Sequence, residues 1–391
     1  MSARVEPRLL AEIGRYGTVS VERCFNCGNC TAICPLSANG ETFPRRLIRY
    51  AQLGLQERLL GSRELWMCYA CGECTQTCPR QADPSEFVAA ARRYAIASYD
   101  PLGLAKILFT APVLSVALLL LLGVLIALVV YTSHGIMPMD RLRLFAFIPA
   151  ATIHDVGVAV IAVVALAGLL GAVNMIVRVR RAAVGPRAPA MRLNWLGALW
   201  ETAAVEVLAQ RRYREDCRPA SDTRPWYLQT WFAHSATLWG FLGLLAATTL
   251  DYVLDLVGLK PTGTWVPPWS PVRLLGTVAG LFLVYGTSLL IVNRWRKADV
   301  TTSHSTVSDW AFLALLWLTG TSGFALEIGV YLPRPEAWAY WTLLGHVAVA
   351  IELLVLLPFT KFAHALYRTI GLYLHALKPV PHAREAEVPA D

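Results

Sequence analysis

Long apolar runs, separated by short polar connections, fill the chain from about residue 107 to residue 366. A helix needs roughly 20 apolar residues to cross the hydrocarbon core of a bilayer. Six runs reach that length, at about 107–131, 153–177, 231–257, 272–293, 309–331 and 340–366. Because backbone groups must be satisfied internally within a bilayer, these runs predict an all-α, six-helix transmembrane bundle over residues 101–370, followed by a tail at 371–391.

The first hundred residues lack such runs and are expected to form a separate α-helical domain, residues 1–100. Residues 44–54 fit one helix, because Pro44 suits a first helical turn and Gly54 suits a C-terminal cap. A short helix is expected around residues 56–60, and an amphipathic helix over residues 85–97 leads toward the membrane. Residues 195–210 are apolar but carry two Glu, which predicts an interfacial helix rather than a span.

The distribution of basic residues predicts which ends of the spans face the cytoplasm. Connections 178–229 and 294–308 carry thirteen Lys and Arg, whereas the connections on the other side carry five. The positive-inside rule then places both termini in the cytoplasm, in a multi-pass protein of the cytoplasmic (inner) membrane. No apolar region of a signal peptide is present at the N-terminus, which agrees with that topology. Much of the net charge of +8 lies in these loops, so membrane topology explains it without nucleic acid.

Eight of the nine cysteines form two copies of a C-x2-C-x2-C-x3-C-P run within the first hundred residues. The first run is Cys24, Cys27, Cys30, Cys34 and Pro35, and the second is Cys68, Cys71, Cys74, Cys78 and Pro79. In two-cluster ferredoxins each run gives three thiolates to one cubane and its fourth thiolate to the other. We therefore expect one [4Fe–4S] cluster on Cys24, Cys27, Cys30 and Cys78, and a second on Cys68, Cys71, Cys74 and Cys34.

Other roles fit these cysteines less well. A zinc ribbon uses two C-x-x-C pairs and has no need of eight cysteines or of a proline after each run. A disulfide framework is not expected in a reducing compartment. The ninth cysteine, Cys217, stands alone in a polar loop and is expected to be inert.

Four histidines, His154, His234, His346 and His364, lie in or at the ends of the predicted spans. Ionisable residues are costly there and are usually functional, and haem iron takes axial imidazoles. His346 and His364 are 18 residues apart, which is about five turns and one face of a single predicted helix. Matched by depth, His234 and His364 are expected to hold an inner haem b, and His154 and His346 an outer one. A role as interfacial anchors remains open, as does the role of the mid-span Glu352.

The arrangement of these motifs resembles known families. Residues 1–100 resemble the two-cluster C component of heterodisulfide reductases, including the residues before the second run, Leu65-Trp66-Met67, and the start of a helix at Pro44-Arg45-Arg46. Residues 150–370 resemble haem b subunits of the nitrate reductase gamma type. That resemblance implies two ligands on a long final helix, matched by His346 and His364, with His234 as the inner partner. The family's outer partner would fall near Ala247, where no histidine stands, so His154 is expected to replace it.

The fused order of the two parts is similar to the C component of quinone-interacting membrane-bound oxidoreductase complexes. The resemblance implies electron exchange between menaquinone or ubiquinone and adenylylsulfate reductase. It also implies two flavin- and Fe–S-containing partners akin to the A component of heterodisulfide reductases. The chain has no glycine-rich phosphate fingerprint, so flavin is expected on those partners.

The sequence thus predicts an electron-transfer subunit of a quinone-dependent oxidoreductase, with no catalytic side chain of its own. Two alternatives remain open. One is a membrane subunit of a heterodisulfide- or sulfite-reducing complex. The other is a membrane anchor with one haem or none.

Overall fold

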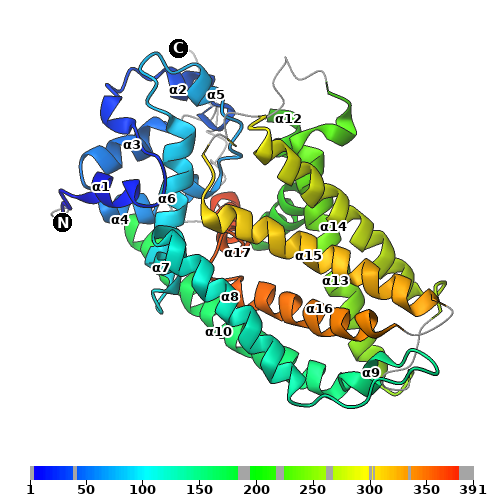
Figure 1. Cartoon of the computed structure of the whole chain (residues 1–391). Coiled ribbons are helices and arrows are strands. Elements are labelled where there is room, and N and C mark those ends of the chain that lie inside the picture. Colours follow the sequence, from blue (N-terminus) through cyan, green and yellow to red (C-terminus); the bar gives the residue numbers. More distant parts are fainter. Residues whose placement is uncertain are drawn as a thin grey trace, which may run out of the picture.

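All regular elements in the described part of the chain are helical, as Figure 1 shows for the computed structural model. The structure describes residues 4–37, 42–183, 194–216, 224–260, 267–298, 302, 304–332 and 336–377. An N-terminal group of short helices lies at one end, and long apolar helices extend away from it (Figure 1). The predicted all-α class is therefore confirmed.

The N-terminal part consists of short helices and 3-10 turns around the two cysteine runs. They are α1 (Leu9–Gly14), η1 (Val21–Arg23), α2 (Asn29–Ile33), η2 (Pro35–Ser37), α3 (Arg45–Gln52), α4 (Gln56–Leu60), η3 (Arg63–Trp66), α5 (Glu73–Gln76) and α6 (Pro84–Tyr99). The helices predicted over 44–54, around 56–60 and over 85–97 are confirmed as α3, α4 and α6. Gly54 follows α3 with φ of 68°, a left-handed conformation that suits glycine at a helix end.

Six helices in the described residues are long and apolar enough to cross a membrane. They are α8 (Pro112–Tyr131), α10 (Ala150–Ala183), α13 (Thr230–Leu256), α14 (Pro271–Trp295), α15 (Val307–Tyr331) and α16 (Ala337–Leu356). Large apolar side chains on α8 and α10 are exposed, among them Leu120 at 68% and Val163 at 68%. Such a surface suits lipid and would be unfavourable in water.

The remaining helices are short and lie between or beside these six. They are α7 (Leu104–Thr110), α9 (Leu144–Phe147), α11 (Trp195–Trp200), the π-helix η4 (Glu201–Leu208), α12 (Arg211–Asp216), η5 (Trp226–Leu228) and α17 (Ala363–Ala376). The helix predicted over 195–210 is thus present as α11 and η4.

Two predicted spans are interrupted, and both interruptions have a proline. The first run, 107–131, breaks at Ala111, and α8 begins at Pro112. The last run, 340–366, is not one helix: α16 ends at Leu356 and α17 begins at Ala363. Pro358 lies in this break and cannot donate the backbone hydrogen bond that a continuous helix requires. The prediction of a single final helix through His346 and His364 was therefore wrong.

The spans pack around α16, which contacts α8, α10 and α15. Half of its most apolar stretch is buried, a larger share than in any other described span. Next to it, α13 and α14 form a closely packed pair. A Cβ on Gly240 of α13 would lie 2.4 Å from the backbone nitrogen of Leu283, so only glycine permits this approach.

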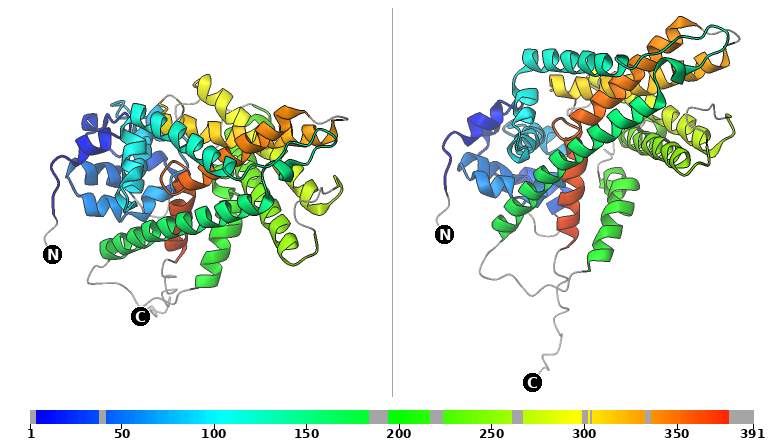
Figure 2. Two further views of the ribbon diagram at one scale, coloured as in Figure 1. Left: turned by 60° about the horizontal axis from the view of Figure 1, so that its bottom comes forward. Right: turned by 90° about the horizontal axis from the view of Figure 1, so that it is seen from below.

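After the break, α17 turns beneath the N-terminal part and lies between it and the α11–η4 segment (Figure 2). One apolar core runs through this junction, since buried residues of α6 and η3 pack with Met175 of α10 and Tyr367 of α17. The N-terminal helices and the membrane helices are therefore packed against each other rather than joined only by a linker.

A buried ion cluster reinforces the same junction. Asp309, at the start of α15, lies 2.7 Å from Nζ of Lys361 in the break before α17. Its carboxylate also lies 3.5 Å from Arg93 of α6 and 3.6 Å from Arg294 of α14. Arg93 in turn pairs with Glu86 at 3.0 Å. Because a buried charge without partners is costly, these contacts hold the ends of three apolar segments against α6.

Candidate redox centre

The two cysteine runs fold into the same local backbone. Asn26 and Ala70 occupy equivalent places and have φ of 61° and 56°, and Gly28 and Gly72 follow with φ of 91° and 86°. The glycines then begin α2 and α5, which pack against each other. Left-handed residues bring backbone N–H groups toward the cysteine side chains, a requirement that glycine meets without strain.

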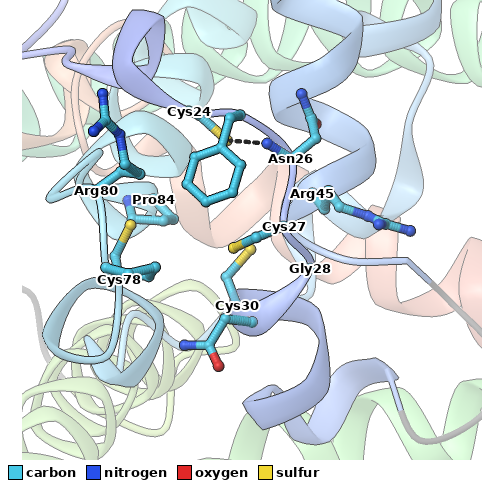
Figure 3. Close-up of a pocket in the computed structure, with 12 residues that line it drawn as sticks. Cys24, Asn26, Cys27, Gly28, Cys30, Arg45, Cys78, Arg80 and Pro84 are labelled. Atoms are coloured by element: carbon cyan, nitrogen blue, oxygen red, sulfur yellow. Dashed lines mark hydrogen bonds between the residues drawn. The ribbon is translucent and has the colours of Figure 1, made fainter.

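A pocket collects three cysteines of the first run together with the last cysteine of the second run (Figure 3). Its lining contains Cys24, Cys27, Cys30 and Cys78. The backbone N–H of Asn26 donates to Sγ of Cys24 at 3.4 Å (Figure 3). This is the set of four thiols that the sequence assigns to the first cluster.

Cys34 lies among the cysteines of the second run. Burial, and to a smaller extent the charges of Cys68 and Cys71, raise the pKa of the Cys34 thiol to about 12. Burial also raises the pKa of Cys74, to which the charges of Cys68, Cys71 and Cys34 contribute. The backbone N–H of Ala70 donates to Sγ of Cys68 at 3.3 Å. Cys34 and Cys74 thus lie near Cys68 and Cys71, and also near Cys30 of the first run.

Crowded, half-buried thiols with raised pKa values lose their protons less readily unless a cation compensates the charge of the thiolates. The irons of a [4Fe–4S] cluster supply that charge, and metal ligation requires the deprotonated form. In the described residues, no three His, Cys, Asp or Glu side chains lie as close together as ligands of one metal ion do. In a cubane each thiolate binds a different iron, so its four sulfurs stand farther apart than around a single zinc.

Two arginines from different parts of the chain hold the backbone around Cys68. Arg92 of α6 donates to the carbonyl oxygens of Leu65 and Cys68, at 2.7 and 2.6 Å. Arg368 of α17 donates from Nη1 to the carbonyl oxygens of Trp66 and Cys68, at 2.9 and 2.7 Å. Helix α17 is thereby bonded directly to the second cysteine run.

His364 lies in the first turn of α17, one turn before Arg368. Its ring centroid is 6.1 Å from that of Trp66, which is fully buried and stands two residues before Cys68. One of the two predicted inner haem ligands therefore contacts the segment that leads into the second cysteine run.

His234, near the start of α13, reaches the same region from the other side. Its Nδ1 lies 2.9 Å from Oε1 of Gln210. In the tautomer that donates from Nδ1, the other ring nitrogen keeps its lone pair for a metal. The ring of Tyr213 meets His234 edge-on at 5.6 Å and stacks on Tyr69 at 5.7 Å. Tyr69 follows Cys68 in the chain, so a second series of ring contacts leads from the second run to an imidazole.

The surroundings of His234 and His364 fit a haem b. A haem b whose iron has two axial histidines would need both imidazoles and space for its ring between them. His234 is one of the exposed residues of α13. The charges of His234, Lys361 and Arg368 act on His364. The charges of Lys361 and Arg368 also act on His234.

The two predicted outer ligands have separate neighbours. Nδ1 of His346, in the middle of α16, lies 2.9 Å from Oγ of Ser322 on α15. The ring of His154 on α10 meets the ring of Tyr252 on α13 edge-on, at 4.8 Å. Among the contacts of the described residues, none joins the two imidazoles. The outer haem site therefore stays a prediction.

Two further positions were named from the sequence. Cys217 lies outside the described residues. Glu352 is buried on α16 and faces α8, where a Cβ on Gly123 would lie 2.8 Å from its carboxylate.

Sequence reasoning did not single out three residues that organise the centre. They are Arg368, Gln210 and Tyr69. Arg368 stands one turn after a predicted ligand, which was a usable signal. Gln210 and Tyr69 are distant in the chain and meet the histidines only through tertiary packing.

Comparison with known proteins supports the iron–sulfur part. Residues 20–82 match the family of 4Fe-4S dicluster domains. The C component of the H(2):CoB-CoM heterodisulfide,ferredoxin reductase of Methanothermobacter thermautotrophicus is 33% identical over 63 residues, 16% of this chain and 34% of that protein. The iron-sulfur C component of the CoB–CoM heterodisulfide reductase of Methanopyrus kandleri is 41% identical over 49 residues, 12% of this chain and 26% of that protein.

A relative of another name matches a longer segment. Citrate utilization protein B of Escherichia coli is 30% identical over 149 residues, 37% of this chain and 37% of that protein. The chain thus spans about a third of the length of the curated relatives it matches. No solved structure matches the chain significantly. Residues 20–82 therefore form an iron–sulfur domain like that of the heterodisulfide reductase C component, on a chain with six helices able to cross a membrane.

Proposed function

We propose that this chain is the membrane subunit that relays electrons between the quinone pool and a soluble flavin- or Fe–S-containing partner. The relay consists of a haem b held by His234 and His364, the second [4Fe–4S] cluster and the first [4Fe–4S] cluster. The cluster ligands are those assigned above, with Cys78 and Cys34 exchanged between the two runs. Both termini are placed in the cytoplasm.

One observation carries this proposal: α17 contains both His364 and the arginine that binds the carbonyl of Cys68. The proposed haem ligand and the backbone of a proposed cluster ligand are thus joined by one short helix. A bound haem b would supply one-electron chemistry. The chain's own residues would hold its iron, keep it next to Trp66, and exclude water through the buried rings of Trp66, Tyr99 and Tyr367.

The order of the relay follows from burial and contact. The second run faces α17, whereas Cys27 of the first run is exposed. Electrons that enter or leave on the membrane side therefore pass the second cluster first, and the first cluster exchanges them with a soluble partner. No side chain performs bond chemistry in this scheme; the protein supplies position and potential.

The proposal is tested by counting haem and iron in the purified full-length chain and in single histidine variants. His234→Ala and His364→Ala should each lose one haem and keep the cluster iron. The matched control is His134→Ala, because His134 is exposed and stacks on Tyr131. Loss of a second haem in His154→Ala and His346→Ala would add the outer site. Wild-type protein that binds no haem after reconstitution would leave only a membrane anchor with clusters.

The partner is proposed in two forms. The first is a pair of flavin- and Fe–S-containing proteins that lead to adenylylsulfate reductase, or a related heterodisulfide- or sulfite-reducing complex. The likeness of residues 20–82 to heterodisulfide reductase components favours this form. The second is a partner in citrate utilization. It is favoured because more than half of the residues aligned with citrate utilization protein B lie outside residues 20–82.

A deletion strain separates these two forms. Impaired growth on citrate, restored by the wild-type chain but not by His364→Ala, supports the second partner. Impaired oxidation or reduction of sulfur compounds with normal growth on citrate supports the first.

A further inference from the structure

The first cysteine run lies at an exposed part of the N-terminal domain. Cys27 is exposed, and the neighbouring Phe25 ring is 61% exposed. The second run, in contrast, is covered by α17 through Arg368. An outside protein can therefore approach the first cluster site more closely than the second.

A groove of 520 Å³ adjoins the pocket of the first run. It is lined by Phe25, Asn26, Thr42, Arg45, Arg46, Arg49 and Tyr50. Three of these residues, Phe25, Asn26 and Arg45, also line the cysteine pocket, so the groove and the pocket are continuous. Arg45 and Arg80 stand on the rim of the pocket in Figure 3.

The lining is strongly basic. Together the groove and the pocket contain four arginines and, among the described residues, no Asp or Glu. Arg46 pairs with Glu64 at 2.6 Å. In the part of the chain that the structure describes, Arg45 and Arg49 make no ion pair, and Arg80 lies 5.9 Å from the centre of the Phe25 ring. Among the described residues, Arg45, Arg49 and Arg80 thus bring positive charge to the first cluster site without an ion pair.

We propose that this groove is the docking surface for an acidic redox protein, which exchanges single electrons with the first cluster across Phe25. The inference rests on the proposed function and adds the location and charge of the partner's contact. Charge complementarity defines the occupant: a negative face is attracted to the four arginines, and the exposed aromatic ring supplies an apolar contact at the centre. In each transfer one electron moves and no covalent bond changes: the oxidised cluster gains an electron from a reduced partner, or the reduced cluster gives one to an oxidised partner.

The test uses the full-length chain with two protein probes of opposite charge. Flavodoxin hydroquinone is an acidic electron donor, and cytochrome c is a basic electron acceptor. The variant is Arg45→Glu/Arg49→Glu. The control is Arg8→Glu/Arg15→Glu, which makes the same change in net charge with exposed arginines of the α1 region that line neither the groove nor the pocket. Arg45→Gln/Arg49→Gln is a milder variant in case charge reversal impairs folding.

Stopped-flow absorbance gives the second-order rate of each electron transfer at low and high salt. With wild-type protein, the flavodoxin rate should fall as salt rises. The double Glu variant should lower the low-salt flavodoxin rate about ten-fold or more, since electrostatic steering changes association rates by roughly 10–10³. The control should change it less than about two-fold, and the double Gln variant should lie between them. The cytochrome c rate should rise in the double Glu variant.

Equal flavodoxin rates in the double Glu variant and its control would overturn the docking surface. A second result would also overturn it: the double Glu variant keeps its flavodoxin rate but no longer binds vesicles that contain anionic lipid. The groove would then face a membrane. Iron content and reduction by dithionite are measured in every sample. A wild-type chain whose clusters do not pass electrons to haem refutes the proposed relay, whereas normal internal transfer with unchanged probe rates refutes only the docking surface.

Discussion

Replacing Arg368 with Met should weaken the attachment of α17 to the second cysteine run. The guanidinium makes two charge-assisted hydrogen bonds, at 2.9 and 2.7 Å, and lies 4.3 Å from the centre of the Tyr69 ring. Hydrogen bonds to charged groups contribute about 1.5–3 kcal/mol each, and an exposed cation–π contact contributes about 0.5–1 kcal/mol. Arg368 is half-buried, so water replaces part of what is lost, and Arg92 still binds the carbonyl of Cys68. The expected loss of stability is about 2–4 kcal/mol.

The loss is measured as the rate at which the purified protein loses cluster absorbance on mild heating. A factor of ten corresponds to about 1.4 kcal/mol, so Arg368→Met should accelerate cluster loss about ten-fold or more. The midpoint potential of the second cluster should also fall, because a nearby positive charge no longer favours the reduced cluster. Arg368→Lys is the matched variant. It keeps the charge but cannot reproduce the planar fork, so its potential should stay near the wild-type value while its stability is intermediate.

Two outcomes would refute this reasoning. Cluster loss at the wild-type rate in Arg368→Met would mean that the α17 contact does not stabilise the second run. An unchanged potential in Arg368→Met, or an equal fall in Arg368→Lys, would mean that the charge of this side chain does not act on the cluster.

Two further predictions concern the same junction. Gly371→Ala should reduce retention of haem and cluster iron during purification, because the new Cβ would lie 2.6 Å from Cβ of Trp66. The control is Gly345→Ala, which should retain both, because a Cβ there has no atom within 4 Å. Burial raises the pKa of Glu86, and Arg93 offsets this only in part, so Glu86 stabilises the fold most at low pH and loses that contribution as pH rises above about 4.5 through the folded pKa. As pH rises, the rate of cluster loss on heating should therefore increase more in the wild type than in Glu86→Gln. Parallel pH profiles in the two proteins would contradict this assignment.

The fold was predictable from the sequence where a local pattern determines it. Six apolar runs predicted the spans, because a bilayer imposes the length and the composition of each run. The helices between the cysteine runs followed from Pro44 and Gly54. The break before α17 was missed although Pro358 stands in the printed sequence, since the spacing of His346 and His364 was taken as evidence for one helix.

The candidate site was predictable only in part, for a physical reason. The predicted cysteine ligands lie in short repeated runs, so the sequence alone predicts which thiols meet. One pocket contains the four assigned to the first cluster, and Cys34 lies near Cys68 and Cys71. Histidine pairs depend on how helices rotate against each other, which residue spacing does not define. The contacts of His234 with Gln210, and of α17 with the carbonyl of Cys68, arise from segments far apart in the chain.

The break after α16 has a consequence for the pace of electron flow. Electron tunnelling slows exponentially with the gap between cofactors, so small fluctuations of that gap cause large variations in rate. His364 and the Cys68 carbonyl are linked through α17, a single helix that begins after the break and packs against α10. When the spans tilt or slide in the bilayer, α17 and the second cysteine run can move as one piece. Because His234 lies on the span α13, a haem held by both histidines would tie that piece to the membrane helices, and tilting of α13 would change the gap between the proposed haem and the proposed cluster.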